Sequence, residues 1–266
     1  MNPHPEPVTT LVRHQLAIRR LAVHTVERPT PRLVRVTLGG AELEGFTSLA
    51  PDDYVRVFFP TPGATELVLP QVGEHGVIWP NSGPQPIARH FTPGRFDPVA
   101  STLQLDIVLH AAGVASAWAT AAKPGQHLGI GGPRESNLVN VDFDAYLLAA
   151  DETGLPALAR WVRELPENVP VSALVEVSDH LDEQELETST RLAIQWVHRT
   201  RDERLQDVIR SLVLPAGRLY IWVAAEASAV QAIRHHLLDE RGLDPETLRA
   251  RGYWKVGIEG DSEQDH

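Results

Sequence analysis

An arginine, an aromatic ring and a hydroxyl group alternate in the stretch Arg89-His90-Phe91-Thr92, which continues through Pro93-Gly94-Arg95-Phe96 to Asp97. If this stretch is extended, Arg89 and Phe91 lie on one face, because strand side chains repeat every two residues. A flat ring beside a fixed positive charge suits a flavin, since the ring can contact the flavin's aromatic system and the guanidinium its phosphate. The same residues also fit an ordinary barrel strand with a surface arginine and a half-buried phenylalanine.

A second candidate site is the start of a short helix at Gly113-Val114-Ala115-Ser116. The Ala-rich run Val114–Ala122 predicts this helix, and Lys123-Pro124-Gly125 would end it. The first backbone N–H groups of a helix have no partner within it, so they are able to bind a phosphate. The alternative is a helix that only closes one end of a barrel.

A third candidate is the turn Asp151-Glu152-Thr153-Gly154-Leu155-Pro156. It follows the continuous apolar run Tyr146–Ala150, which predicts a strand covered on both faces. In parallel sheets, ligands bind at the carboxyl ends of strands, so Thr153 and Gly154 are placed to receive a pyrophosphate. The turn has no G-x-G-x-x-G pattern, and the alternative is that Asp151 and Thr153 only cap the following helix.

Composition limits the partners of these sites. The chain has 266 residues, 24 Lys plus Arg, 35 Asp plus Glu and a net charge of −11, so it repels nucleic acid and anionic membranes. An anionic cofactor therefore needs a locally basic pocket, and arginines must supply it because Lys123 and Lys255 are the only lysines. The absence of cysteine excludes disulfides and thiolate metal sites and fits a cytoplasmic protein. Residues 1–7 do not resemble a signal peptide, and no apolar run is long enough to span a membrane.

The first half of the chain must hold the arginine stretch and the short helix. Residues 1–15 are polar and Pro-rich, which predicts a flexible tail. Residues 16–141 contain short alternating runs separated by turn residues, which is typical of a small antiparallel β-barrel.

The second half, residues 142–258, alternates strand and helix patterns. This order predicts a parallel, doubly wound α/β sheet. One predicted helix is Ser228–Arg241, with Ser228 and Gln231 as a capping box and Gly242 at its end. A last strand is predicted over 252–257, and residues 259–266 form an acidic tail that we expect to be disordered.

Three segments in this order and spacing resemble the siderophore-interacting protein family. They are Leu105–Ala119, Leu147–Ala157 and Gly252–Gly257. The family comprises FAD-containing ferric-siderophore reductases related to the ferredoxin–NADP reductases, and the resemblance covers roughly residues 16 to 257. It implies an FAD-binding barrel over 16–141 and an NAD(P)-binding-like domain over 142–258.

The resemblance also implies roles for residues of the first domain. Arg89 would contact the FAD pyrophosphate, Phe91 would pack on the isoalloxazine or ribityl chain, and the Thr92 hydroxyl would donate to the reactive ring nitrogen. The remaining FAD-binding residues would be His110, Gly113, Ala115 and Ser116.

In the second domain, the implied cofactor residues surround the strand ends. They are Asp151, Thr153, Gly154 and Glu226. Trp254 and Lys255 lie where the family's last strand faces the active-site cleft, so Lys255 would attract an anionic ferric siderophore. The alternatives are a solvated surface lysine and an aromatic residue that belongs to the core.

Four positions depart from the family pattern. Phe91 replaces a usual Tyr, Gly94 a usual Arg, Val114 a usual Pro, and Ala225 a usual Gly. The change at Gly94 removes a charge-assisted phosphate contact worth ~1.5–3 kcal/mol. Arg95 cannot replace it without a local backbone change, because a shift of one residue reverses the strand face.

The leading hypothesis is therefore a cytoplasmic FAD-dependent oxidoreductase that reduces a ferric siderophore or similar chelate. NAD(P)H or ferredoxin would donate the electrons, and neither nucleic acid nor a membrane would be a partner. The four departures motivate an alternative, a flavin-free protein of the same fold that acts as a redox-neutral cyclase or isomerase in natural-product biosynthesis. A third hypothesis is a non-catalytic siderophore-binding protein.

Overall fold

The structure is a computed structural model that describes residues 8–64, 66–74, 76–79, 81, 85–110, 113–139 and 143–258. The chain divides into two compact units, one over Arg13–Ser136 and one over Asn137–Ile258 that also includes the N-terminal residues up to Val12. The predicted boundary at 141/142 and the predicted acidic tail at 259–266 lie outside the described residues.

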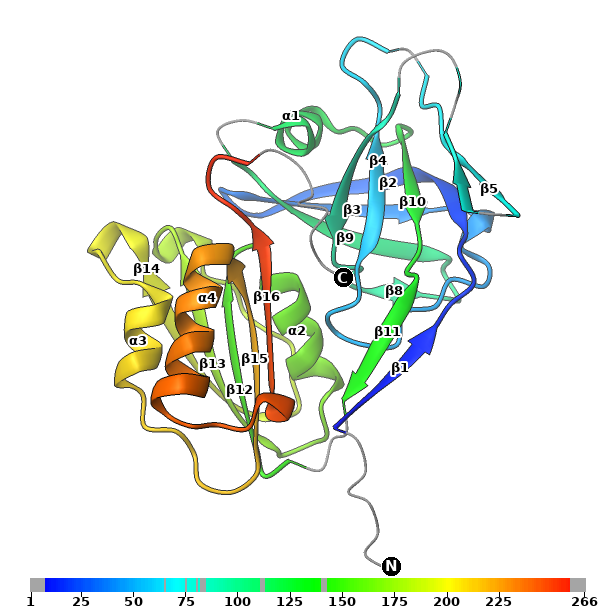
Figure 1. The fold of residues 1–266 in the computed structure, drawn as a ribbon. Coiled ribbons are helices and arrows are strands. Elements are labelled where there is room, and N and C mark those ends of the chain that lie inside the picture. Colours follow the sequence, from blue (N-terminus) through cyan, green and yellow to red (C-terminus); the bar gives the residue numbers. More distant parts are fainter. Residues whose placement is uncertain are drawn as a thin grey trace, which may run out of the picture. The chain divides into compact units, whose positions relative to one another are not determined.

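The first unit is built on a seven-stranded antiparallel sheet in the order β7-β4-β10-β2-β3-β9-β8, which curves into a half-barrel (Figure 1). Its strands are β2 (Ile18–Thr30), β3 (Leu33–Gly39), β4 (Val55–Phe59), β7 (Ile87–Phe91), β8 (Phe96–Asp97), β9 (Thr102–Val108) and β10 (His127–Gly131). The antiparallel β class predicted for this half of the chain is confirmed.

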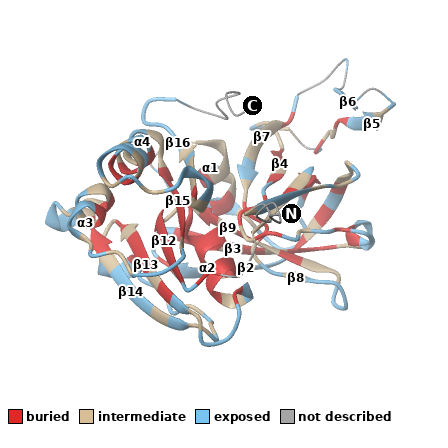
Figure 2. Cartoon of the chain, turned by 60° about the horizontal axis from the view of Figure 1, so that its bottom comes forward, coloured by how far each residue is buried: buried red, intermediate tan, exposed pale blue. Residues whose placement is uncertain are grey.

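Alternating apolar residues produce this curved sheet. In β9, Leu103, Leu105 and Ile107 are buried, whereas the residues between them are partly exposed. Side chains of this kind from β2, β3, β4 and β10 meet in one apolar cluster. Figure 2 colours the buried residues of these strands red. A strand of period two that places its apolar face inward needs no further specification of register.

The stretch 87–97 joins the two edges of the sheet. It begins as β7, which pairs only with β4, and ends as β8, which pairs only with β9. Between them, Gly94 N donates to Gln104 O at 2.9 Å and Gln104 N donates to Arg95 O at 2.8 Å. The segment with the arginine, the ring and the hydroxyl therefore closes the open side of the half-barrel.

Smaller elements complete the first unit. They are the 3₁₀ helix η1 (Ala41–Leu43), the hairpin β5 (Gln71–Gly73) and β6 (Gly76–Ile78), and helix α1 (Val114–Ala121). Helix α1 follows the sequence prediction, and Trp118 on it contacts the apolar cluster of the sheet.

A two-stranded ladder forms between β1 (Thr9–Arg13) and β11 (Glu135–Val139). The prediction that residues 1–15 form a flexible tail is wrong for 9–13. The polar sequence of β1 carries little apolar signal because four of its five residues are exposed. Its order comes from backbone pairing with β11, which a polar strand provides as well as an apolar one.

The second unit is built on a five-stranded parallel sheet in the order β14-β13-β12-β15-β16 (Figure 1). The strands are β12 (Ala145–Asp151), β13 (Pro170–Val177), β14 (Arg191–His198), β15 (Leu219–Glu226) and β16 (Leu248–Trp254). The central strand β12 is buried at every residue, as its continuous apolar run predicts.

Helices cover both faces of this parallel sheet. Helix α2 (Leu155–Glu164) packs into one apolar cluster, and α3 (Leu205–Ser211) and α4 (Ala227–His235) pack into the other (Figure 2). A π-helical segment, η4 (His236–Glu240), extends α4, and the 3₁₀ helices are η2 (His180–Asp182), η3 (Arg199–Arg201) and η5 (Pro245–Thr247). The predicted doubly wound α/β class is confirmed.

Local details differ from the sequence prediction at two places. Helix α4 is capped by Glu226, whose side chain accepts from Ser228 N and Ala229 N, so the predicted capping box of Ser228 with Gln231 is wrong. The last strand spans 248–254 instead of 252–257, which leaves Lys255 just beyond its end. Gly242 ends the helix with φ +67° and an N–H that donates to Leu238 O, as predicted.

Candidate functional site

Arg89 and Phe91 occupy the same side of β7, as the two-residue period predicts. Arg89 lies opposite Val57 and Phe91 opposite Val55, and both valines are buried in the half-barrel core. The Arg89 Nη1 donates to Ala88 O at 2.8 Å. Among the described residues, no carboxylate pairs with the Arg89 guanidinium, so this half-buried positive charge lacks an internal counterion.

Phe91 packs against the core instead of standing alone. Its ring centroid lies 6.0 Å from that of Phe59, and Phe59 lies 5.6 Å from Trp118 of α1, both edge-on. One aromatic ring thus contacts both β7 and α1. Next to it, Thr92 is 8% exposed, and no partner of its hydroxyl falls within the described part of the chain.

The N-terminus of α1 has no side-chain cap and, among the residues that the structure describes, no acid in its first turn. Its N-cap, Gly113, has φ +126°, and a Cβ added there would meet nothing within 4 Å. Glycine is needed for this conformation, and no described residue outside its chain neighbours would contact a side chain there. The backbone N–H groups of the first turn therefore point to a place where an anion can approach.

Two predicted ligands near α1 have structural roles as well. The Ser116 Oγ accepts from His110 N at 2.9 Å and lies 3.5 Å from Val108 O, so this hydroxyl holds the connection between β9 and α1. Ala115 is half-buried against the core cluster. The residues that fit a phosphate best are Arg89 and the backbone of the first turn.

The N-terminus of α2 is arranged differently. The Asp151 Oδ1 accepts from Thr153 N at 2.8 Å, from Thr153 Oγ1 at 2.6 Å and from Gly154 N at 3.4 Å. Pro156 stands in the first turn and has no N–H to donate. The carboxylate of Asp151 thus binds the N–H groups of Thr153 and Gly154 within the turn, whereas α2 itself starts at Gly154 without a side-chain cap.

At Gly154, the neighbouring strand β15 leaves no room for a side chain. A Cβ added to Gly154 would lie 2.6 Å from Ala224 O and 3.0 Å from the Cβ atoms of Ala150 and Ala224. Contacts that short require the backbone to move. The glycine therefore serves the packing of the turn on β15, and its presence does not by itself indicate a close approach of a ligand.

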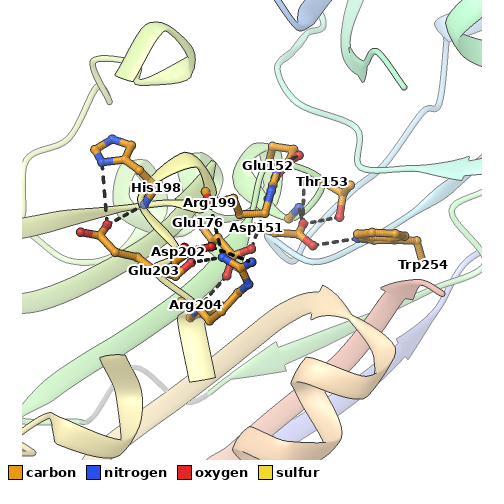
Figure 3. Close-up of polar contacts among 12 residues, drawn as sticks. Asp151, Glu152, Thr153, Glu176, His198, Arg199, Asp202, Glu203, Arg204 and Trp254 are labelled. Atoms are coloured by element: carbon orange, nitrogen blue, oxygen red, sulfur yellow. Dashed lines mark hydrogen bonds and ion pairs between the residues drawn. The ribbon is translucent and has the colours of Figure 1, made fainter. Parts of the chain in front are cut away.

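Asp151 also reaches Trp254 (Figure 3). Its Oδ2 accepts from Trp254 Nε1 at 2.7 Å, and the carboxyl group is 3% exposed. Burial raises the pKa of Asp151 to about 6, and neighbouring Glu152 acts in the same direction, whereas the hydrogen bonds from Thr153 and Trp254 oppose the rise. The sequence places both residues in the site but does not predict that they are bonded.

Beside this pair, Arg199 joins two carboxylates (Figure 3). Both its Nη atoms bond the Glu152 carboxylate, and Nη1 lies 3.3 Å from Glu176 Oε1. Although burial opposes it, these two carboxylates raise the pKa of Arg199. The other oxygen of Glu176 accepts from Leu205 N at 2.7 Å, at the start of α3. Sequence reasoning missed Arg199 and Glu176, because no local pattern pairs residues from three different strand ends.

At α4, the Glu226 carboxylate likewise accepts from backbone N–H groups at the start of the helix. Its Oε2 accepts from Ser228 N and Ala229 N, and its Oε1 accepts from Val256 N at 3.3 Å. Although partial burial opposes it, these hydrogen bonds hold the pKa of Glu226 below its usual value. Lys255, which lies between the end of β16 and Val256, is exposed. Carboxylates at the ends of β12, β13 and β15 thus accept from backbone N–H groups in the turn before α2 and at the starts of α3 and α4.

The structure clarifies two of the departures from the family pattern. A Cβ added to Gly94 would lie 3.2 Å from Gln104 O, so an arginine does not fit there without a small backbone shift. Ala225 is 2% exposed and belongs to the apolar cluster below α4, so its methyl group packs into the core.

An antiparallel half-barrel followed by a parallel doubly wound sheet is a fold class that includes flavin-dependent reductases. A solved structure of this class, the cytochrome b5 reductase domain of Ulva prolifera nitrate reductase, matches in fold with a TM-score of 0.62 at 12% identity, over 87% of this chain and 96% of that one. Residues 22–137 match the siderophore-interacting FAD-binding domain, and residues 143–257 match the siderophore-interacting protein model. The chain belongs to the siderophore-interacting protein family.

Individual relatives agree over nearly the whole chain. The chain is 38% identical to the NADPH-dependent ferric-chelate reductase of Escherichia coli, over 91% of this chain and 95% of that protein. It is 30% identical to the ferric vibriobactin reductase ViuB of Vibrio cholerae, over 85% and 84%. A siderophore utilization protein from T. fusca has a similar structure, with a TM-score of 0.88 and 38% identity over 95% of this chain and 98% of that one.

Family membership confirms the predictions from resemblance at the level of class. The chain is an oxidoreductase with FAD as its cofactor. Among the described residues, no helix combines the length and apolar character needed to span a membrane. The individual site residues stay predictions.

Proposed function

We propose that this protein reduces a ferric siderophore or a similar ferric chelate, with electrons that pass from NAD(P)H through FAD. The relatives named for ferric-chelate and ferric vibriobactin reduction support this substrate class, and the first supports NADPH as donor. Iron(II) binds hard oxygen ligands less tightly than iron(III), so reduction releases the metal.

The observation that carries the proposal is the combination of Arg89 and the start of α1. Arg89 has no carboxylate partner within the described residues, and α1 presents an uncapped first turn. In a chain of net charge −11, these are the features that an anionic cofactor requires. The residues therefore fit the two phosphates of FAD.

Each residue would act by position. Arg89 and the N–H groups of Val114–Ser116 would bind the phosphates, Phe91 would contact the flat ring system, and the Thr92 hydroxyl would donate a hydrogen bond to it. Bound FAD supplies the redox chemistry itself. No side chain of the chain has to act as acid, base or nucleophile in an electron transfer.

Lys255 is the candidate for holding the substrate. It is exposed beyond the end of β16, beside the half-exposed ring of Trp254. A ferric siderophore with net negative charge would be attracted by the ammonium group and would contact the indole. Because Asp151 occupies Thr153 N and Gly154 N, we do not place the phosphates of the electron donor at the start of α2.

The test is a visible absorption spectrum of the purified protein, followed by titration with FAD and an assay of ferric-chelate reduction with NADPH and with NADH. We expect a yellow protein, or one that becomes yellow with FAD, and chelate reduction that requires both FAD and a nicotinamide donor. A colourless protein that takes up no FAD at high micromolar concentration would overturn the proposal. That result would favour a flavin-free cyclase or a binding protein.

A further inference from the structure

Carboxylates hold both ends of the segment Trp254–Val256, which starts at the last residue of β16. Trp254 Nε1 donates to Asp151 Oδ2 at 2.7 Å, and Val256 N donates to Glu226 Oε1 at 3.3 Å. Lys255 lies between these two attachments. Its backbone is therefore fixed on both sides, while its side chain stays exposed.

Asp151 makes its attachment across the sheet. It ends the central strand β12, Trp254 ends the outermost strand β16, and β15 lies between the two. The two residues are 103 positions apart in the sequence. The bond therefore links the end of the buried centre of the sheet to the end of its edge strand, where a strand has one neighbour only.

Both oxygens of this carboxylate are needed. Oδ1 accepts from Thr153 N and Thr153 Oγ1, whereas Oδ2 accepts from Trp254. An asparagine offers one acceptor oxygen and one NH₂ group, which can serve one side of this arrangement but not both. The indole ring of Trp254 is 40% exposed, and this hydrogen bond fixes the direction of its N–H.

We propose that Asp151 is a positioning residue for substrate binding, which holds the Trp254 indole and thereby presents Lys255 to an anionic ferric chelate. The inference rests on the proposed function, because it assigns Lys255 to the substrate. Asp151 touches neither cofactor nor substrate; it acts through Trp254. Fixing the segment in advance lowers the entropy lost when the chelate binds.

Two variants test this role, Asp151→Asn and Trp254→Phe. Trp254→Phe keeps a ring at the half-exposed position but lacks the N–H donor, so we expect this variant to fold. Each should raise KM for an anionic ferric chelate by about three- to fivefold, the range expected for losing one surface charge contact, with kcat nearly unchanged. The dependence of KM on ionic strength should weaken as well, because Lys255 is no longer held toward the substrate.

The matched control is Asp244→Asn. Asp244 Oδ1 accepts from Glu246 N at 2.9 Å, just before the first residue of β16. This variant makes the same change of charge and removes a similar hydrogen bond between an aspartate and a backbone N–H group. It should leave KM and its salt dependence at the wild-type values.

A measurement without substrate or cofactor isolates the hydrogen bond itself. The indole N–H resonance of Trp254, assigned by its loss in Trp254→Phe, should shift and exchange faster with solvent in Asp151→Asn. The double variant should have the same KM as either single variant, because both changes remove one shared contact.

Lys255→Ala separates the two hypotheses. It should raise KM by about fivefold and remove most of its salt dependence. If Lys255→Ala has no effect on either quantity, the assignment of Lys255 under the proposed function fails. If Lys255→Ala has this effect but Asp151→Asn and Trp254→Phe leave KM unchanged, the positioning role of Asp151 is wrong while the proposed function stands.

Discussion

The helices α1 and α2 both begin at a glycine N-cap without a side-chain cap, but the turns that precede them differ. At α1, Gly113 supplies no side-chain cap, and no acid stands in the first turn among the described residues. At α2, the Asp151 carboxylate accepts from the turn at Thr153 and Gly154, and Pro156 removes a further donor. A carboxylate therefore occupies the turn before α2, whereas none does so before α1 among the described residues.

The difference teaches that position in the fold is not sufficient to predict a phosphate site. The start of α2 lies at the carboxyl end of a parallel strand, the place where such sheets usually bind nucleotides. Glu176 at α3 and Glu226 at α4 repeat the arrangement of Asp151. A helix N-terminus binds phosphate when its own chain has not already supplied a carboxylate.

Removing the cation on β7 should have the largest effect. Arg89→Ala should weaken FAD binding by up to about a hundredfold, because a charge-assisted contact is lost and a phosphate is left poorly paired. Fluorescence titration of the apoprotein with FAD measures this. Arg234→Ala, an exposed arginine on α4, is the control and should bind FAD as wild type does. Equal affinity for both variants would remove Arg89 from the phosphate site.

The closed helix should show itself in the pH dependence of stability. The pKa of Asp151 is raised to about 6, so the folded state holds this proton while the unfolded chain has lost it. Wild-type stability should therefore fall as the pH rises from about 4 to about 6, by on the order of 2–3 kcal/mol from this group.

Urea unfolding across this range, compared between wild type and Asp151→Asn, measures the contribution. The asparagine variant should lack this fall. Glu226→Gln provides a contrast of opposite sign, because the lowered pKa of Glu226 stabilises the fold at higher pH and this stabilisation is lost as the pH falls. Parallel curves for wild type and Asp151→Asn would contradict the buried, proton-binding carboxyl.

Giving α1 an acid should convert it toward the closed type. Ala115→Asp places a carboxylate in the first turn, which the helix dipole tolerates or favours, but which repels a phosphate. FAD affinity should fall about tenfold while thermal stability stays near wild type. Ala115→Asn, of the same shape without the charge, should lose much less affinity. An unchanged affinity in the aspartate variant would exclude this helix as the phosphate site.

Adding a second cation should have the smallest effect. Gly94→Arg restores the residue usual in the family, but its Cβ would lie 3.2 Å from Gln104 O, so backbone strain offsets the added charge. We expect FAD affinity to improve by less than about threefold. Gly94→Ala adds the same Cβ without the guanidinium, so the ratio of the two affinities isolates the charge. A tenfold or larger improvement would show that the backbone adapts freely.

Much of the fold could be predicted because its signals are local. Alternation in β9 and the continuous apolar run of β12 each identify a strand and its surroundings without distant information. The strand β1 could not be predicted in this way, since its residues are mostly exposed and only pairing with β11 orders it. The cap of α4 could not be predicted either, because Ser228 is a preferred N-cap residue whereas the glutamate that caps the helix, Glu226, is not.

The candidate site was predictable as a set of positions but not as a set of contacts. Strand periodicity predicts that Arg89 and Phe91 share one face, and the structure keeps that arrangement, whereas Thr92 lies just beyond the end of β7. The bond between Asp151 and Trp254 and the pairing of Arg199 with Glu152 depend on strand order. No spacing in the sequence encodes which strand ends become neighbours.

The ladder between β1 and β11 has a consequence for shortened forms of the chain. A version that begins at residue 16, where the apolar pattern starts, would lose β1 and the bond from His14 N to Arg134 O. It would also lose the contact between His14 Nε2 and Ser136 Oγ. The Ser136 hydroxyl in turn donates to the buried Asp53. The amide groups of β11 would then exchange rapidly with solvent and offer an open edge to other chains. The polar residues of β1 thus cover a strand edge that their loss would expose.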